Sequence, residues 1–494
     1  MKFVHLKFTV FFFLLPAFCI ATNTGQAEIL IQSSDYQINF DGFVEKPAWE
    51  LPQNFPLTMH SPIYNNQPEE KSKVFISYHN DYFGDGTILY YKNISDIIAT
   101  SRKRDEEAST SDAFGIILDS YSDNENALGF FTMPSGQKID FTISNNGQQV
   151  GLADSRNCTW NAFWDVKTKI TDSVWHVEMR IPFSSLRFQR IDGNIKMGLI
   201  INRRIVHLNG VDTYPFIDTK YDPGASTKIS LDQTIVVKNE TYRNPVYIAP
   251  YVLSGIESNY HIDETGTGYQ QTLEPELTSG TDVKYNLNNN LTLDFTANTD
   301  FAQVEADDEI VNLTRYSLFL PEKRLFFQER SGIFNFSLDG PQHLFYSRNI
   351  GFVDNEPVRI PGGARMIGRV GKWDLGLLDM NTARLNSNPA ENFSAIRLWK
   401  QVINERTYVG GMLINKADFD SGYNVAYGID VIFSPDNENY LDVETARTAE
   451  INNKNDIFSL APSYSSIGLQ KRSMSGLFYS GKYAYWGKAF TFKI

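Results

Sequence analysis

Hydrophobic and polar residues alternate along much of the second half of the chain. The alternation is strict in the segment Leu291–Asn298, and a two-residue period is typical of a β-strand with one apolar and one polar face. The same period returns in four other stretches, at 283–287, 373–377, 408–414 and 423–433. The pattern predicts an antiparallel sheet whose apolar face could meet lipid and whose polar face could line a lumen, although a soluble sandwich has the same period.

The first half of the chain contains shorter apolar runs that predict strands. The predicted strands lie at 74–78, 88–91, 114–118, 128–132, 139–143, 162–170, 175–181 and 196–203. Breakers such as Gly84–Gly86 and Asn145–Gly147 separate them, and a long amphipathic helix is not evident. Regularly spaced short strands of this kind predict an all-β sandwich.

Three further segments set the domain boundaries. Residues 1–27 contain Lys2 and Lys7, then the apolar run Phe8–Ile20 and a small, polar stretch, which is the pattern of a secretory signal peptide. Residues 238–245 are polar and end in proline, as a linker often does. We therefore predict a signal peptide at 1–27, a sandwich at 28–237, a linker at 238–245 and a second domain at 246–494.

Charge and cysteine content exclude some partners and bonds. The formal net charge is −13 and becomes more negative when Lys2 and Lys7 leave with the signal peptide, so nucleic acid is not an expected partner. Removal of Cys19 leaves Cys158 as the single cysteine. An internal disulfide bond is then impossible.

Three phrases of the first half, at 38–49, 112–121 and 175–188, resemble the family 9 carbohydrate-binding module. The resemblance covers the sandwich region, and it implies a β-sandwich that binds carbohydrate. It also implies a link to carbohydrate breakdown, because this module is commonly associated with xylanases and related O-glycosyl hydrolases. Trp49 and Trp175 lie within these phrases and are assigned to packing.

Sugar recognition requires flat aromatic faces against the sugar rings and polar side chains at the rim of the site. Candidate stacking residues are Trp160, Trp164, Tyr90 and Tyr214. Candidate hydrogen-bonding residues are Asn161 and Asp165, which lie beside the two tryptophans in the sequence. The alternative is that these aromatic residues belong to the core, as most do.

Three phrases of the second half, at 300–307, 321–329 and 345–351, resemble an uncharacterised family, number 5916 among the domains of unknown function. That family typically follows a family 9 module in exported proteins of Bacteroidetes-type bacteria, and it is thought to form an outer-membrane β-barrel. Its C-terminal region usually runs further than this chain, which stops at Ile494. We therefore expect a truncated chain whose barrel could not close alone.

Catalytic motifs are not evident. The sequence lacks a Gly-x-Ser-x-Gly elbow, an HExxH pair and a P-loop. The acidic run Glu305–Glu309 is interpreted as solvated, and no cofactor is expected.

The acidic loops at 81–85 and 119–125 could hold calcium, but solvated turns are the preferred interpretation. Arg324, Arg330 and Arg348 could bind an anion, or they could pair with acids inside the lumen, which is preferred.

These inferences together predict an all-β protein with an N-terminal sandwich and an antiparallel outer-membrane barrel, which is incomplete if the chain is truncated. The expected function is capture of a polysaccharide or oligosaccharide at the outer membrane, with membrane lipid as the second partner. Two alternatives remain open. One is an exported glycoside hydrolase with its catalytic carboxylates in the second half, and the other is a structural envelope protein.

Overall fold

The structure is a computed structural model that confirms the all-β class. It describes residues 27–34, 39–44, 49, 54–79, 81–106, 109–147, 156–158, 160–188, 190–218, 225–238, 246–262, 268–288, 290–299, 322–336, 344–353, 356–385, 388–404, 407–418, 422–433, 439–451, 459–460 and 464–471. Within these ranges the α-helices are α1 (Phe183–Leu186) and α2 (Leu325–Gln328). No helix in this part of the chain is long and apolar enough to cross a membrane. Residues 1–26 of the predicted signal peptide, the 300–307 phrase and the Glu305–Glu309 run lie outside the described residues.

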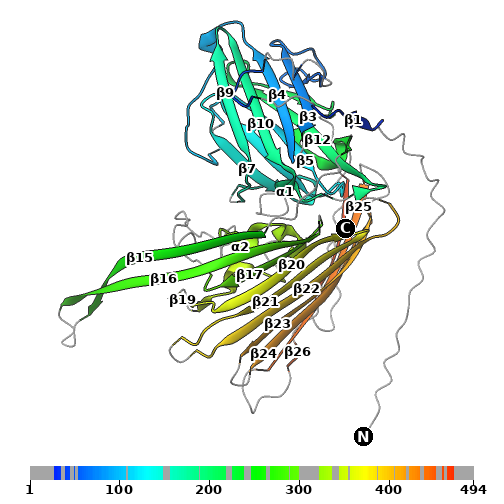
Figure 1. Cartoon of the computed structure of the whole chain (residues 1–494). Helices are drawn as coiled ribbons and strands as arrows, with labels where there is room; N and C mark the ends of the chain where they lie inside the picture. Colours follow the sequence, from blue (N-terminus) through cyan, green and yellow to red (C-terminus); the bar gives the residue numbers. More distant parts are fainter. Residues whose placement is uncertain are drawn as a thin grey trace.

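The first half forms two sheets (Figure 1). The larger sheet runs in the order β1 (Ile29–Ile31), β14 (Gln233–Val237), β12 (Asn194–Ile205), β5 (Ala113–Asp119), β6 (Ala127–Thr132), β7 (Lys138–Ile143) and β8 (Arg156–Asn157). Two more strands, β11 (Arg190–Ile191) and β13 (Gly210–Tyr214), also pair with β12, and β2 (Thr58–Ser61) pairs with β13. The smaller sheet runs in the order β3 (Ser72–His79), β4 (Tyr82–Tyr90), β10 (Val174–Pro182) and β9 (Asp165–Thr171). All eight strands predicted for this half are present.

The main hydrophobic core lies between these two sheets. Trp175 on β10 and Leu199 on β12 are fully buried there. Ile200, the next residue on β12, joins a second apolar cluster with Ile117 of β5. The central strands of the larger sheet are therefore apolar on both faces, as a continuous apolar run in a strand predicts. Trp49 is also buried, so both tryptophans assigned to packing are confirmed in that role.

The second half forms one long antiparallel sheet. Its order is β15 (Val246–Ile262), β16 (Tyr269–Asn288), β17 (Leu291–Ala297), β20 (Gly362–Val370), β21 (Trp373–Asn381), β22 (Glu391–Gln401), β23 (Tyr408–Asp418), β24 (Tyr423–Phe433) and β25 (Asn439–Ile451), and β25 pairs with both β26 (Ser459–Leu460) and β27 (Tyr464–Lys471). A short hairpin, β18 (Phe352–Val353) and β19 (Glu356–Pro357), stands apart from it. Within the described residues the sheet is open, an arrangement that the prediction allowed.

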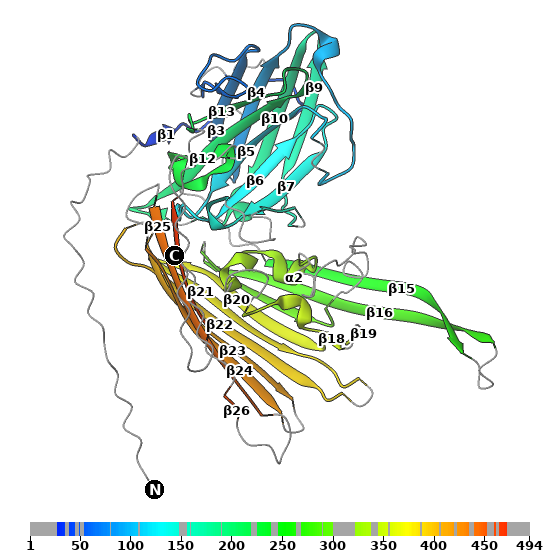
Figure 2. The ribbon, with the colours of Figure 1, turned by 180° about the vertical axis from the view of Figure 1, so that it is seen from behind.

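One face of this sheet is covered by residues 322–336 and 344–353, which lie between β17 and β20 in the sequence (Figure 2). The covering segment contains α2 and the 3-10 turns η8 (Ser331–Phe334) and η9 (Ser347–Asn349). Phe326 and Phe334 of this segment pack with Ile367 and Met412 of the sheet. We call the covered side the inner face and the opposite side the outer face.

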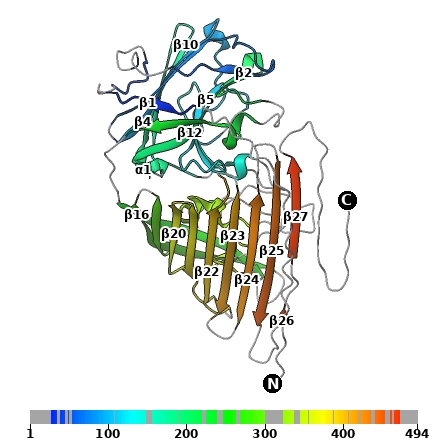
Figure 3. The same ribbon diagram turned by 90° about the vertical axis from the view of Figure 1, so that its right-hand side faces the viewer.

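The sandwich stands at one end of the strands of the second sheet (Figure 3). Arg187, just after α1, pairs with Glu329 of the covering segment, with 2.9 Å between Nε and Oε1. The hydroxyl of Tyr408 donates to the carbonyl oxygen of Asp123, at 2.8 Å. These contacts are buried, so the two halves meet in an ordered interface.

Candidate functional site

The segment 160–165 leads into β9 and presents alternate side chains to the core and to solvent. Trp160 and Trp164 point inward, and both meet the ring of Phe130 edge-on, at centroid distances of 6.1 and 5.4 Å. Both indoles are buried. In this structure neither offers a ring face to a sugar. Trp160 and Trp164 are core residues, as the alternative interpretation predicted.

Asn161, Phe163 and Asp165 point outward from the same segment, and we call these three residues the 161–165 face. The side chain of Phe163 is 71% exposed. Its ring stacks on Tyr247 of β15, with 5.5 Å between centroids and 11° between planes. The hydroxyl of Tyr247 in turn donates to Ser184 Oγ, at 3.0 Å. Phe163 is therefore held from one side and presents its other side to solvent.

Charged side chains surround the 161–165 face. The carboxylate of Asp165 accepts hydrogen bonds from Lys138 Nζ at 3.3 Å and from Arg180 Nη2 at 3.1 Å. Partial burial would raise the pKa of Asp165, but the hydrogen bonds and charges of these two cations outweigh it and hold the pKa below its usual value. Asn161 Oδ1 accepts from Arg104 Nε at 2.9 Å. Polar groups with fixed orientation thus lie on both sides of an exposed aromatic ring.

The other two predicted site residues lie elsewhere on the sandwich. Tyr90 ends β4 and packs beside the buried Trp49 cluster, with Lys73 Nζ 5.9 Å from its ring centroid. Tyr214 ends β13 and meets Phe55 edge-on at 5.2 Å, and burial raises the pKa of its hydroxyl. Of the six predicted residues, Asn161 and Asp165 therefore share an exposed surface. Phe163 was missed, although its spacing of two residues from each of them could have indicated it.

The acidic loop at 119–125 is buried, so the prediction of a solvated turn is wrong for it. Asp119 accepts hydrogen bonds from the backbone N–H groups of Asp123 and Asn124, at 3.2 and 2.8 Å. Burial raises the pKa of Asp119 well above its usual value. Arg330 and Arg369 from the second half approach Asp123 Oδ2, each at 3.7 Å. The second sheet packs against this loop and excludes water, and these contacts occupy oxygens that a calcium ion would need.

In the other acidic loop, 81–85, Asp85 is fully buried on β4. Its Oδ1 accepts a hydrogen bond from Thr87 Oγ1 at 3.0 Å, and burial raises the pKa of this carboxyl well above its usual value. A solvated turn is therefore the wrong description of Asp85 as well, because this residue belongs to a strand that is packed on both sides.

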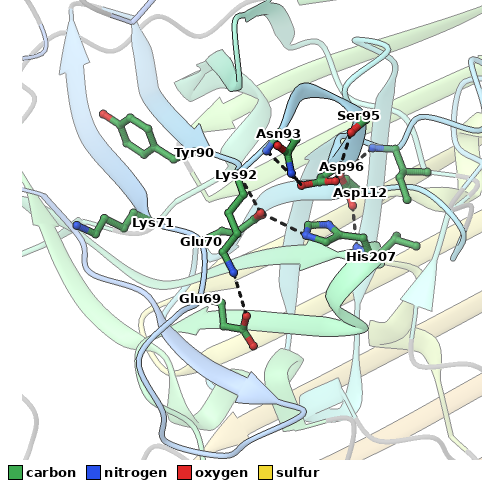
Figure 4. Close-up of polar contacts among 12 residues, drawn as sticks. Glu69, Glu70, Lys71, Tyr90, Lys92, Asn93, Ser95, Asp96, Asp112 and His207 are labelled. Atoms are coloured by element: carbon green, nitrogen blue, oxygen red, sulfur yellow. Dashed lines mark hydrogen bonds and ion pairs between the residues drawn. The ribbon is translucent and has the colours of Figure 1, made fainter.

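A different group of residues has the composition of a metal site. Glu70, Asp96 and His207 offer ligand atoms that all lie within 4.8 Å of one another. Figure 4 shows the side chains of Glu70 and His207 directed toward each other, with Asp96 beside them. The distance from His207 Nε2 to Glu70 Oε1 is 3.3 Å.

Arginine and acid side chains pair on the inner face of the second sheet. Arg365 Nη2 donates to Asp294 Oδ2 at 2.7 Å, and these two residues are register partners on β20 and β17. The preferred interpretation, pairing with acids, is confirmed for Arg324, which bonds Glu322, and for Arg330, which bonds Asp374. These pairs account for the buried arginines without an anionic ligand.

Comparison with known proteins gives partial matches. Residues 246–360 match the model of a domain of unknown function, DUF5916. Among solved structures, the chain is similar to a family 9 carbohydrate-binding module from Caldicellulosiruptor kristjanssonii in complex with cellotriose, with 16% identity, coverage of 44% of this chain and 95% of that one, and a TM-score of 0.28. It is also similar to a proposed carbohydrate-binding protein from Bacteroides uniformis ATCC 8492, with 8% identity and a TM-score of 0.33. This match covers 43% of this chain and 100% of that one. No curated protein matches the chain.

Proposed function

We propose that this protein is exported to the outer membrane, where its sandwich captures glycans and its second sheet contacts lipid. The observation that carries the glycan proposal is the 161–165 face. It combines an exposed phenyl ring, an amide and a carboxylate on one short segment. A sugar ring stacks its C–H face on an aromatic ring, while an amide accepts from and donates to its hydroxyls and a carboxylate accepts from them.

The position of the face supports this role. Phe163 is supported from behind by Tyr247, and Ser185 Oγ donates to the Phe163 carbonyl at 2.8 Å. Asp165 is fixed between Lys138 and Arg180. Groups that are already oriented lose less conformational entropy when a ligand binds, so a weak polar ligand such as a sugar gains affinity from this arrangement.

The test is a titration of the full chain in detergent with soluble plant and bacterial glycans. Binding is followed by calorimetry and by tryptophan fluorescence, since Trp164 lies one residue from Phe163. Phe163→Ala should weaken binding by about 5- to 30-fold, because a stacked aromatic face contributes roughly 1–2 kcal/mol. The control is Phe216→Ala, which removes another exposed ring, one that contacts Tyr64 instead.

Two results would contradict the glycan proposal. The first is that no glycan binds the wild-type chain, which would favour a structural envelope protein. The second is that Phe163→Ala and Phe216→Ala bind equally well, which would move the site away from the 161–165 face. Release of reducing sugar from the same glycans would favour the hydrolase alternative. That alternative needs two free carboxylates, whereas the buried acids Asp294 and Asp430 are bonded to arginines.

The outer face of the second sheet supports the membrane part of the proposal. Large apolar side chains on this face are exposed, although such residues are normally buried in water-soluble proteins. They include Phe295, Trp373, Ile396, Leu398, Leu413 and Ile429. The face also has an apolar groove of about 540 Å³ that Trp373, Ile396 and Leu413 help to line. A sheet whose outer face is apolar and exposed, while its charged side chains are paired on the inner face, is the arrangement that lipid favours.

A further inference from the structure

We infer that Glu70, Asp96 and His207 form a binding site for a divalent transition metal ion such as Zn²⁺. The three residues come from separate parts of the sandwich. Glu70 precedes β3, Asp96 ends the 3-10 turn η2 (Ile94–Asp96), and His207 lies in the 3-10 turn η4 (Val206–Leu208). The inference concerns a region distinct from the 161–165 face and does not depend on glycan binding.

The distances suit a small ion. Two ligands of a tetrahedral zinc ion lie about 3.4 Å apart, since each bond is about 2.0–2.1 Å long. His207 Nε2 and Glu70 Oε1 are already 3.3 Å apart. The Asp96 oxygen lies within 4.8 Å of both atoms, so a modest movement of one side chain completes three ligands. A water molecule would supply the fourth.

Surrounding groups hold the ligands in place. Arg203 is fully buried, and its Nη2 lies 3.4 Å from Glu70 Oε2, which leaves Oε1 directed toward His207. The backbone N–H of Lys92 also donates to Glu70 Oε1, at 3.2 Å. Asp96 Oδ2 accepts from the backbone and side-chain nitrogens of Asn93, at 3.2 and 3.0 Å. Outer contacts of this kind orient metal ligands and tune their affinity.

Charge at this site favours a cation. Besides Glu70 and Asp96, the buried carboxylates of Asp112 and Asp212 lie in the same region, and Arg203 is the buried guanidinium beside them. Asp212 Oδ2 has no hydrogen-bond partner among the residues that the structure describes. Lys92, the neighbouring exposed cation, pairs with Glu69. Buried acids without matching cations are costly, and a divalent ion would offset that cost.

The ligand types select the metal. Calcium and magnesium take oxygen ligands, whereas an imidazole with two carboxylates suits zinc and similar transition metals. The side chain of His207 is 22% exposed, so an ion can enter from solvent. Once bound, the ion would join η2, η4 and the start of β3, which are far apart in the sequence. Its expected role is therefore to stabilise this edge of the sandwich.

The test uses the full chain without an affinity tag, stripped with a chelator and titrated with Zn²⁺ by calorimetry. We expect one ion per chain and a rise in the thermal midpoint. Loss of a contact that only orients a metal ligand weakens metal binding by roughly 10- to 100-fold. Because His207 and Asp96 are direct ligands, His207→Ala and Asp96→Asn should each weaken Zn²⁺ binding by more than this. The control is Glu69→Gln, which removes an exposed neighbouring carboxylate and should bind Zn²⁺ as the wild type does.

Two outcomes would overturn the inference. One is a wild-type chain that binds no Zn²⁺, which would reduce the His207–Glu70 contact to an ordinary hydrogen bond. The other is Zn²⁺ binding that survives both His207→Ala and Asp96→Asn, which would place the ion elsewhere. Asp96→Asn retains the size of the side chain, so it tests the site even where His207→Ala fails to fold. An excess of Ca²⁺ should not displace the bound Zn²⁺.

Discussion

Asp140 on β7 shows how one buried carboxyl makes stability depend on pH. Its side chain is fully buried. Burial raises its pKa to about 6, although the hydrogen bond from the Ala162 N–H and the charge of Arg104 act in the opposite direction. The folded state therefore holds a proton more tightly than the unfolded state. The stabilising contribution is fully present below the unfolded pKa, near 3.8, and is lost as the pH rises through about 6.

We predict that Asp140→Asn makes the free energy of unfolding less dependent on pH between 4 and 7. In the wild type this carboxyl removes up to about 3 kcal/mol of stability over that range, since each pKa unit corresponds to about 1.4 kcal/mol. Denaturant titrations at several pH values measure the slope. Asp165→Asn is the control, because the pKa of Asp165 is lowered and its stabilisation is lost only at more acidic pH. An unchanged slope in Asp140→Asn would contradict the argument.

At the level of strands, Gly410 on β23 leaves room for an ion pair that crosses its strand. Arg397 of β22 reaches over β23 to Asp430 of β24, with 2.5 and 2.6 Å between nitrogen and oxygen atoms. A Cβ atom at Gly410 would lie 2.5 Å from Asp430 Oδ1 and 2.9 Å from Arg397 Nη1. The absence of a side chain at this position therefore allows three strands to share one buried pair.

We predict that Gly410→Ala destabilises the second sheet by about 3 kcal/mol or more, because the added methyl group overlaps the Trp399 ring as well as the buried ion pair. Gly411→Ala is a matched control. It is the next residue, it points to the outer face, and a Cβ atom there would have its nearest neighbour at 3.7 Å. Denaturant midpoints of the two variants in detergent give the comparison. Equal midpoints would show that the pair adapts to the added methyl group.

Strand positions could be predicted from the sequence because each depends on local alternation. The predicted strand 114–118 lies within β5, and 175–181 lies within β10. In an irregular segment, alternation groups the side chains into two sets, but it does not decide which set faces the core. Trp160 and Trp164 lie in such a segment, and the ring of Phe130, which is distant in sequence, decides that they pack inward.

The metal site was not predicted for a related reason. Glu70 and His207 are far apart in the chain, and their approach depends on how β3 and β12 are positioned by the whole sandwich. Short-range spacing is informative for ligands on one helix or one loop. It carries no information about three ligands that each come from a different turn.

At the scale of the whole molecule, the sandwich and the second sheet meet through several buried polar contacts. Glu329 accepts from Arg187 of the sandwich and from Lys284 of β16. The guanidinium of Arg330 lies over the ring of Tyr121, 4.1 Å from its centroid. Phe163 itself stacks on a residue of β15. The 161–165 face is therefore fixed relative to the second sheet, so the position of that sheet in a membrane would set the direction in which the face points.

The membrane proposal gives the last prediction. Ile396 is the central residue of β22, is exposed on the outer face, and is flanked by Leu377 and Leu413 on the neighbouring strands. In a bilayer, Ile396→Arg should cost about 2–4 kcal/mol and reduce the amount of folded protein in the membrane fraction. In water, an exposed position tolerates the same change within about 0.5 kcal/mol.

Lys400→Arg is the control, because Lys400 lies on the same face of the same strand and already carries a charge. Fractionation of cells that express each variant, followed by denaturant titration of detergent-extracted protein, separates the two environments. A loss of membrane-inserted protein for Ile396→Arg alone would indicate that the outer face meets lipid. Equal recovery of both variants would instead indicate that this face meets water, because an apolar environment penalises an unpaired charge strongly and water does not.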